Sequence, residues 1–291
     1  LIKLSYKKTH KAKLLALKTE QFDMALRLNE RLRTLILSRS SDLPPIMDLT
    51  AELNDISQEN KRLLHEISVF NYVHDVYTKI LTHHYSNTGS KQVDFDMNVL
   101  RSIEIMEEMI HSNPVASKKT AVFRCHALLT FESSLKHNFI KAAEYAGQLI
   151  ELFKDNPEFV KFNQLLYAKS LSSAIVCFIW NLNFEYAWEL LKEFQAVCEQ
   201  HMSNNERHYQ RLYMQSLSYE ANLLRGLNYL DQSDDFAQKA EKYLASTKAL
   251  KRINDELTLM AATAELYFFN GNFKQCSVIC YQRMSLYPNS E

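Results

Sequence analysis

The feature that most constrains the fold of this chain is an asparagine–aromatic dipeptide that recurs at a nearly constant spacing. Four copies place their aromatic residues 45, 45 and 44 residues apart, namely Asn138-Phe139, Asn183-Phe184, Asn228-Tyr229 and Asn272-Phe273. Each copy lies between two long segments of apolar periodicity, which predicts the tight turn of a helical hairpin. Asparagine tolerates the left-handed conformation that ends one helix and can cap the next. We therefore expect a helical repeat whose aromatic residues are largely buried at the elbows.

The scarcity of turn residues supports this prediction. The 291 residues include 4 Gly and 5 Pro, well below the usual shares of about 7% and 5%. Sheets and phosphate-binding loops need such residues, so the composition predicts an all-α fold. First helices are expected at 114–137, 157–182, 204–227 and 248–270, and second helices at 139–154, 184–201, 231–246 and 273–287. Asn113-Pro114 and Asn156-Pro157 combine a capping residue with a first-turn proline at two of the starts.

Residues 46–84 follow a heptad pattern instead. Steps of three and four connect Ile46, Leu49, Leu53, Ile56, Asn60, Leu63, Ile67, Phe70, His74, Tyr77 and Leu81. An uninterrupted 3.5-residue period predicts one long helix with a coiled-coil-like seam. Two partners could cover the seam: a basic helical hairpin formed by residues 1–38, or a second copy of the chain with Asn60 setting the register. We favour the hairpin, which would meet the acidic residues of 48–59, so a monomer is expected and a homodimer stays open.

The turns resemble those of tetratricopeptide (TPR) repeats. Asn138-Phe139…Ala142, Asn183-Phe184…Ala187, Phe22…Ala25 and Gly271-Asn272-Phe273 match that family's Gly/Asn-aromatic-x-x-Ala pattern. The period of 44–45 residues exceeds the family's usual value of about 34, and Gln232 and Cys276 replace the alanine in two copies. The resemblance implies a right-handed α-solenoid of TPR-like hairpins with lengthened helices over residues 46–291, after an N-terminal hairpin at 1–38. A HEAT-type array has a similar period and is the alternative fold.

The resemblance also implies a binding groove. Arg124, Lys169, Met214 and Thr258 lie fifteen positions before the turn aromatics, and Leu135, Trp180, Arg225 and Phe269 lie four positions before them. The equivalent offsets face the groove in TPR proteins, so the resemblance implies a concave face with Arg124, Lys169 and Arg225 around Trp180. Cations beside an aromatic ring suit an acidic peptide or one that ends in a free carboxylate. The alternative is that the longer helices shift this register, which would leave ordinary surface or core residues.

No motif for catalysis or cofactor binding is present. The sequence lacks a P-loop and the HExxH, CxxC and GxSxG patterns. Cys276 and Cys280 have a spacing that could chelate a metal, but no His or carboxylate accompanies them on that helix face, so core packing is the preferred interpretation. We expect a non-enzymatic scaffold without cofactor or metal that binds a protein or peptide. The alternative is the sensor module of a signalling or transcriptional regulator whose effector domain lies outside this sequence.

Charge, apolar runs and cysteine content indicate which partners and which cellular compartment to expect. The 34 basic and 34 acidic residues cancel, which argues against nucleic-acid binding by this chain alone. No run of about 18 apolar residues occurs, so no membrane span is expected. Five cysteines, an odd number, suit a reducing compartment, and we expect a cytoplasmic protein. Because the chain starts at Leu1, we expect a fragment or processed form whose signal peptide or anchor, if any, would lie outside it.

Overall fold

The computed structural model describes residues 2–39, 48–86, 97–112, 117–202, 207–246 and 253–286. Every regular element in these ranges is a helix and none is a strand, which confirms the all-α prediction. The chain divides into two compact units, residues 1–136 with 155–162 and residues 137–154 with 163–291. The boundary expected between 1–38 and 46–291 falls inside the first unit.

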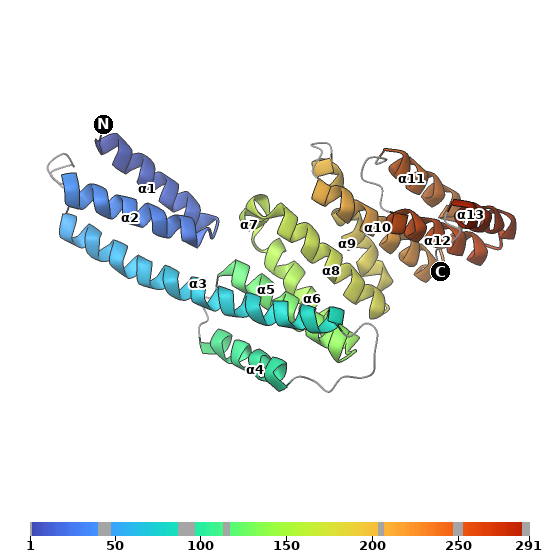
Figure 1. The fold of residues 1–291 in the computed structure, drawn as a ribbon, viewed down its shortest axis with the longest axis horizontal. Coiled ribbons are helices and arrows are strands. Elements are labelled where there is room, and N and C mark those ends of the chain that lie inside the picture. The colour runs from blue at the N-terminus through green and yellow to red at the C-terminus, as the bar shows by residue number, and fades with distance from the viewer. Residues whose placement is uncertain are drawn as a thin grey trace. The chain divides into compact units, whose positions relative to one another are not determined.

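The first unit is built on one helix of 38 residues, α3 (Leu49–Ser86), shown in Figure 1. The helix passes through residues 58–61 without a break, which confirms the prediction of a single long helix; residues 46 and 47 lie outside the described part of the chain. The hairpin of α1 (Ile2–Lys18) and α2 (Phe22–Arg39) packs along α3 through α2. The N-terminal hairpin therefore covers this part of the seam, as we favoured.

Apolar and polar contacts both fix the hairpin on α3. The two core clusters contain the buried residues Leu32, Ile36 and Ile56, and Ala16, Ala25 and Leu63. The fully buried side chain of Asn29 donates hydrogen bonds to Asn60 Oδ1 at 2.8 Å and to Glu59 Oε2 at 2.9 Å. The Lys13 ammonium lies 3.1 Å from the same Glu59 oxygen. Asn60 thus pairs within the chain, and the expected basic-to-acidic contact is present.

The seam prediction is wrong in the second half of α3. The buried face consists of Val69, Val73, Val76 and Ile80, whereas the predicted seam residues Phe70 and Tyr77 are half-buried and His74 is exposed. The buried residues lie one position earlier than the predicted seam where α4 (Met97–Ser112) and α5 (Lys118–Thr130) replace α2 as neighbours, because these helices contact a different face of α3.

The start of α5 is held from outside the helix. Ser117 is its N-cap and accepts a hydrogen bond from Thr120 N–H at 3.1 Å, while the expected start at 113–114 lies outside the described residues. The N–H groups of Lys118 and Lys119 donate to the two carboxylate oxygens of Glu20 at 2.9 and 2.8 Å. The elbow of the N-terminal hairpin thus caps a helix almost a hundred residues away. A short π-helix, η2 (Phe131–Leu135), follows α5.

The second unit is a row of hairpins. It contains α6 (Phe139–Lys154), α8 (Gln164–Trp180), α9 (Phe184–Met202), α10 (Arg207–Gly226), the 3-10 turn η3 (Leu230–Gln232), α11 (Ser233–Ser246), α12 (Ile253–Phe269) and α13 (Phe273–Leu286). The first helices α8, α10 and α12 contact one another in sequence. The second helices α6, α9 and α11 each contact the first helix of the following hairpin. The order of elements matches the predicted hairpins.

The predicted helix over 157–182 is wrong, because it is two helices. α7 (Pro157–Phe162) starts at the predicted Asn-Pro pair but ends after six residues, and α8 begins at Gln164. Between them Asn163 leaves the helical region, with φ −131° and ψ 40°. Asparagine is a weak helix former because its side chain competes for nearby backbone groups. The break also coincides with the boundary between the two units.

The turns use a left-handed residue in a register that differs from the expected one. The residue with positive φ is His137, Leu182 and Gly271 at three turns, so the following asparagine begins the next helix instead of ending the previous one. At the third turn Asn228 itself has a φ of 59°. There Tyr229 N–H donates to Leu224 O at 2.8 Å, the bond that Asn272 makes to Tyr267 at the fourth turn. Asn228 thus occupies the place that the residue before the asparagine has at the other three turns, so the dipeptide at 228–229 lies one residue earlier in its turn.

The prediction that all four turn aromatics are largely buried is wrong. Phe139 and Phe184 are half-buried, while Tyr229 and Phe273 are 42% and 61% exposed. Phe139 stacks on Trp180 with ring centroids 5.2 Å apart, and the Phe184 ring lies against Gly226. The first two aromatics therefore pack on the end of the next hairpin's first helix instead of inside their own elbow.

Candidate functional site

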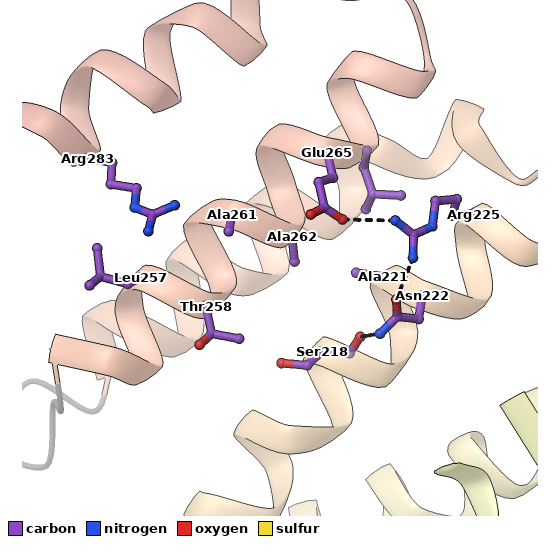
Figure 2. Close-up of a pocket in the computed structure, with 11 residues that line it drawn as sticks. Ser218, Ala221, Asn222, Arg225, Leu257, Thr258, Ala261, Ala262, Glu265 and Arg283 are labelled. Atoms are coloured by element: carbon purple, nitrogen blue, oxygen red, sulfur yellow. Dashed lines mark hydrogen bonds and ion pairs between the residues drawn. The ribbon is translucent and has the colours of Figure 1, made fainter. Parts of the chain in front are cut away.

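A pocket of about 500 Å³ lies in the second unit, between the first helices α10 and α12. Figure 2 shows its lining side chains. α10 contributes Ser218, Asn222 and Arg225 from a face with helical spacing, and α12 contributes Leu257, Thr258 and Glu265 in the same way. Alanines at 221, 261 and 262 leave the space between the two helices open. Arg283 of α13 reaches in from the side.

Arg225 is held in place by three neighbours. Its Nη1 donates to Glu265 Oε2 at 2.9 Å and its Nη2 donates to Asn222 Oδ1 at 2.9 Å. The guanidinium carbon lies 5.6 Å from the ring centroid of Phe269, within the range of a cation–π contact. Asn222 is fixed in turn because its Nδ2 donates to the Ser218 carbonyl at 3.0 Å. The guanidinium therefore stands in a set orientation at the rim of the pocket.

Arg283 has no such partner. Its side chain is half-buried, and no carboxylate of the described residues forms an ion pair with it. Figure 2 shows its guanidinium pointing from α13 toward α12, between Leu257 and Ala261. Among the described residues that line it, the pocket therefore combines two guanidinium groups with one carboxylate, that of Glu265. An anionic group of a ligand would balance this charge.

Three of the four predicted groove residues lie in this unit. Lys169 and Trp180 are both exposed on α8, which contacts α10. They are eleven residues apart, close to three whole turns, so they share one face of α8. Trp180 is 61% exposed despite its stacking on Phe139. Arg225 lines the pocket described above, as does Thr258, which the same repeat register had placed in the groove.

The fourth residue, Arg124, lies on α5 in the first unit. It is half-buried, and its Nε atom is buried without a hydrogen-bond partner among the described residues. Burial raises the pKa of the neighbouring Cys125 thiol, and the Arg124 charge offsets part of that rise. That Arg124 shares a face with Lys169, Trp180 and Arg225 stays a prediction.

Sequence reasoning missed Asn222, Glu265 and Arg283. Glu265 stands one helical turn before Phe269 and two turns after Thr258, so helical spacing alone could have added it to the groove face. Asn222 could have been found in the same way, three residues before Arg225. Arg283 is on a second helix, and no periodicity of the first helices points to it.

Three of the five cysteines, Cys125, Cys177 and Cys198, are buried. Burial raises the pKa of Cys177 and of Cys198 to about 12, so both thiols are protonated at neutral pH. Cys276 and Cys280 are in contact on α13, with Cys276 half-buried and Cys280 exposed, so the preferred interpretation as core residues is wrong for Cys280. Within the described ranges, no group of three or more His, Cys, Asp or Glu side chains is arranged to hold a metal ion.

No helix among the described residues has the length and apolar character needed to cross a membrane. Comparison with known proteins found no matching family model and no significant match among curated proteins.

Proposed function

We propose that this chain is a non-enzymatic interaction scaffold that binds a carboxylate-bearing peptide in the pocket between α10 and α12. The observation that carries the proposal is the pair of arginines, Arg225 and Arg283, around an open space whose described lining residues include one carboxylate, Glu265. The peptide would supply the anion, as an acidic side chain or as a free C-terminus.

The pocket has the chemistry and size for such a group. Guanidinium groups bind carboxylates through two parallel N–H···O bonds, which gives both strength and direction. The Asn222 contact and the Phe269 ring hold Arg225 in orientation, so less rotamer entropy is lost on binding. A volume of about 500 Å³ accommodates one or two residues of a peptide.

The arrangement of hairpins supports an extended binding face. α8 contacts α10 and α10 contacts α12, and the three helices carry residues at equal offsets from their turns. We propose that the hairpins form a right-handed TPR-like α-solenoid and that these helices line its concave side, where such arrays bind their partners. Lys169 and Trp180 on α8 would then contact peptide residues beyond the one held at Arg225.

An array of fluorescent peptides with free or amidated C-termini and acidic or amide side chains tests the proposal. We expect the protein to prefer peptides with a free carboxylate, and we expect Arg225→Ala and Arg283→Ala each to reduce that binding by about tenfold or more. Arg211→Ala, which removes an exposed arginine of α10 outside the pocket, is the matched control and should bind like the wild type. Equal losses in all three variants, or no preference for carboxylates, would contradict the proposal.

A further inference from the structure

The last described helix, α13, has an open apolar face. None of its residues 273–285 is buried. The exposed large apolar side chains are Phe273 at 61%, Val278 at 43%, Tyr281 at 68% and Met284 at 57%. Figure 1 shows α13, in dark red, beside α12, the helix on which it packs. Contiguous exposed apolar surface of this kind marks an interaction site.

The repeat provides a reference for what covers such a face. In α9, two hairpins earlier, Ala187, Leu190 and Leu191 are 0%, 2% and 1% exposed. The residues 89 positions later, at 276, 279 and 280 of α13, are half-buried or exposed. The difference follows from neighbours, because α9 lies against both α8 and α10 whereas α13 has α12 alone among the described helices that pack closely on it.

The turn aromatics show how a helix that covers α13 would lie. Phe184, the first residue of α9, packs against Gly226, the last residue of α10. Phe139 and Trp180 have the same relationship in α6 and α8. In both cases the covering helix places its C-terminal end on the first residue of the helix that it covers and runs antiparallel to it. Phe273 is the equivalent first residue of α13.

We propose that α13 binds an amphipathic helix of a partner, antiparallel to α13 and with its C-terminal turn on Phe273. The partner presents glycine or a flat aromatic ring to Phe273, as Gly226 and Trp180 do to their phenylalanines. This surface is separate from the α10–α12 pocket and does not depend on the function proposed for it.

Charge defines the partner helix further. α13 contains no carboxylate, and its Lys274 lies next to Phe273, whereas Arg283 enters the α10–α12 pocket. A second copy of α13 would have no carboxylate to place beside Lys274, so an acidic helix is the better electrostatic match. The negative end of an antiparallel helix dipole would instead lie beside Lys274, and carboxylates flanking the apolar stripe would add to that attraction. The partner helix is therefore acidic.

Cys280 reports on occupancy of this face. It is exposed on α13, whereas Cys125, Cys177 and Cys198 are buried and burial raises the pKa of all three thiols. Iodoacetamide therefore alkylates α13 first, because the thiolate is the reactive form. A helix bound across α13 shields Cys280 from the reagent.

The probes are two synthetic peptides of residues 207–226, the helix that covers α9 and ends in Gly226. In one peptide Arg207, Arg211 and Arg225 are replaced by Glu, and in the other by Lys. We expect the Glu peptide to slow alkylation of Cys280, by about tenfold at about nine times its Kd, because only the unbound fraction reacts. The Lys peptide should protect at least several-fold less at the same concentration.

Two protein variants locate the effect. Met284→Asp places a carboxylate on the open face at an exposed position, so the fold is kept and protection by the Glu peptide should be lost. Leu4→Asp changes a similarly exposed apolar residue of α1 and should leave protection unchanged. Absence of protection, or equal protection by both peptides, would overturn the proposal. So would a dimer of the chain in sedimentation equilibrium that Met284→Asp converts to a monomer, because a second copy would then occupy the face.

Discussion

The ring of Phe184 occupies the space that a Cβ atom on Gly226 would need, with its Cδ1 and Cε1 atoms 2.9 Å from that position. We therefore expect Gly226→Ala to destabilise the protein by about 1–3 kcal/mol, the usual cost of overpacking. Gly147 is the matched control, because it lies inside α6 with nothing within 4 Å of its added Cβ. Gly147→Ala should stabilise by about 0.5–1 kcal/mol through helix propensity. Urea unfolding measures both, and equal stability of the two variants would contradict the contact.

The same contact can be isolated with a second change. Phe184→Ala should cost about 2 kcal/mol, less than the 3–5 kcal/mol typical of a fully buried phenylalanine, because the ring is half-buried. In the Phe184→Ala background the cost of Gly226→Ala should vanish, since the ring that collides with the new methyl group is gone. An undiminished cost in the double variant would place the strain elsewhere.

Glu20 should contribute to stability through a helix that is distant in sequence. Its carboxylate accepts hydrogen bonds from the first two N–H groups of α5, so Glu20→Ala should cost about 1 kcal/mol, as loss of an N-cap does. Glu20 also has a φ of 53°, so Glu20→Gly, which loses the same cap but tolerates that conformation, should cost less. Hydrogen exchange of the Lys118 and Lys119 amides should accelerate in both variants. Unchanged exchange would mean that the cap has no energetic weight.

Glu59 makes part of the stability depend on pH. Burial alone would raise its pKa, but the hydrogen bonds from Asn29 and Lys13 and the Lys13 charge outweigh burial and lower it. The resulting stabilisation is complete above the ordinary glutamate pKa of about 4.3 and is lost as the pH falls through the lower folded-state value. Glu59→Gln should therefore cost about 1 kcal/mol at pH 7 and almost nothing at the acid end. Urea titrations from pH 7 downward test this, with the exposed Glu151→Gln as a control that should show no such trend.

The fold was predictable in its elements because local chemistry determines them. Few glycines and prolines, apolar periodicity and asparagine-led turns define α6, α9 and α10 to within a few residues. The break at Asn163 and the one-residue shift at Asn228 were not predictable, since each depends on the backbone conformation of one asparagine, and the residue type alone does not determine it.

The candidate site was predictable only where the repeat places it. Arg225 and Thr258 follow from their offsets to the turns, and both line the pocket. Arg283 enters from a second helix, and the exposure of Phe273 follows from the absence of a covering helix in the described part of the chain. Neither fact is encoded in the spacing of the dipeptides, because each depends on tertiary neighbours.

Glu265 should compete with a bound peptide for Arg225. It occupies Nη1 at 2.9 Å and its charge repels an incoming carboxylate. We expect Glu265→Gln to raise the affinity for a carboxylate peptide by about fivefold, while the free energy of unfolding changes by less than about 1 kcal/mol because the ion pair is exposed. Fluorescence polarisation measures the affinity, with Glu185→Gln on α9 as the control for an exposed charge outside the pocket. A weaker affinity in Glu265→Gln would show that this carboxylate helps to bind the ligand.

The most direct test of peptide binding in the α10–α12 pocket is calorimetric titration of the best acidic peptide as a free acid and with its carboxylates amidated. We predict that the wild type binds the free acid at least about tenfold more tightly. In the double variant Arg225→Ala/Arg283→Ala, the two forms should bind with nearly equal affinity. A preference for the free acid that is the same in the wild type and the double variant would contradict the account, because the carboxylate would then be recognised elsewhere.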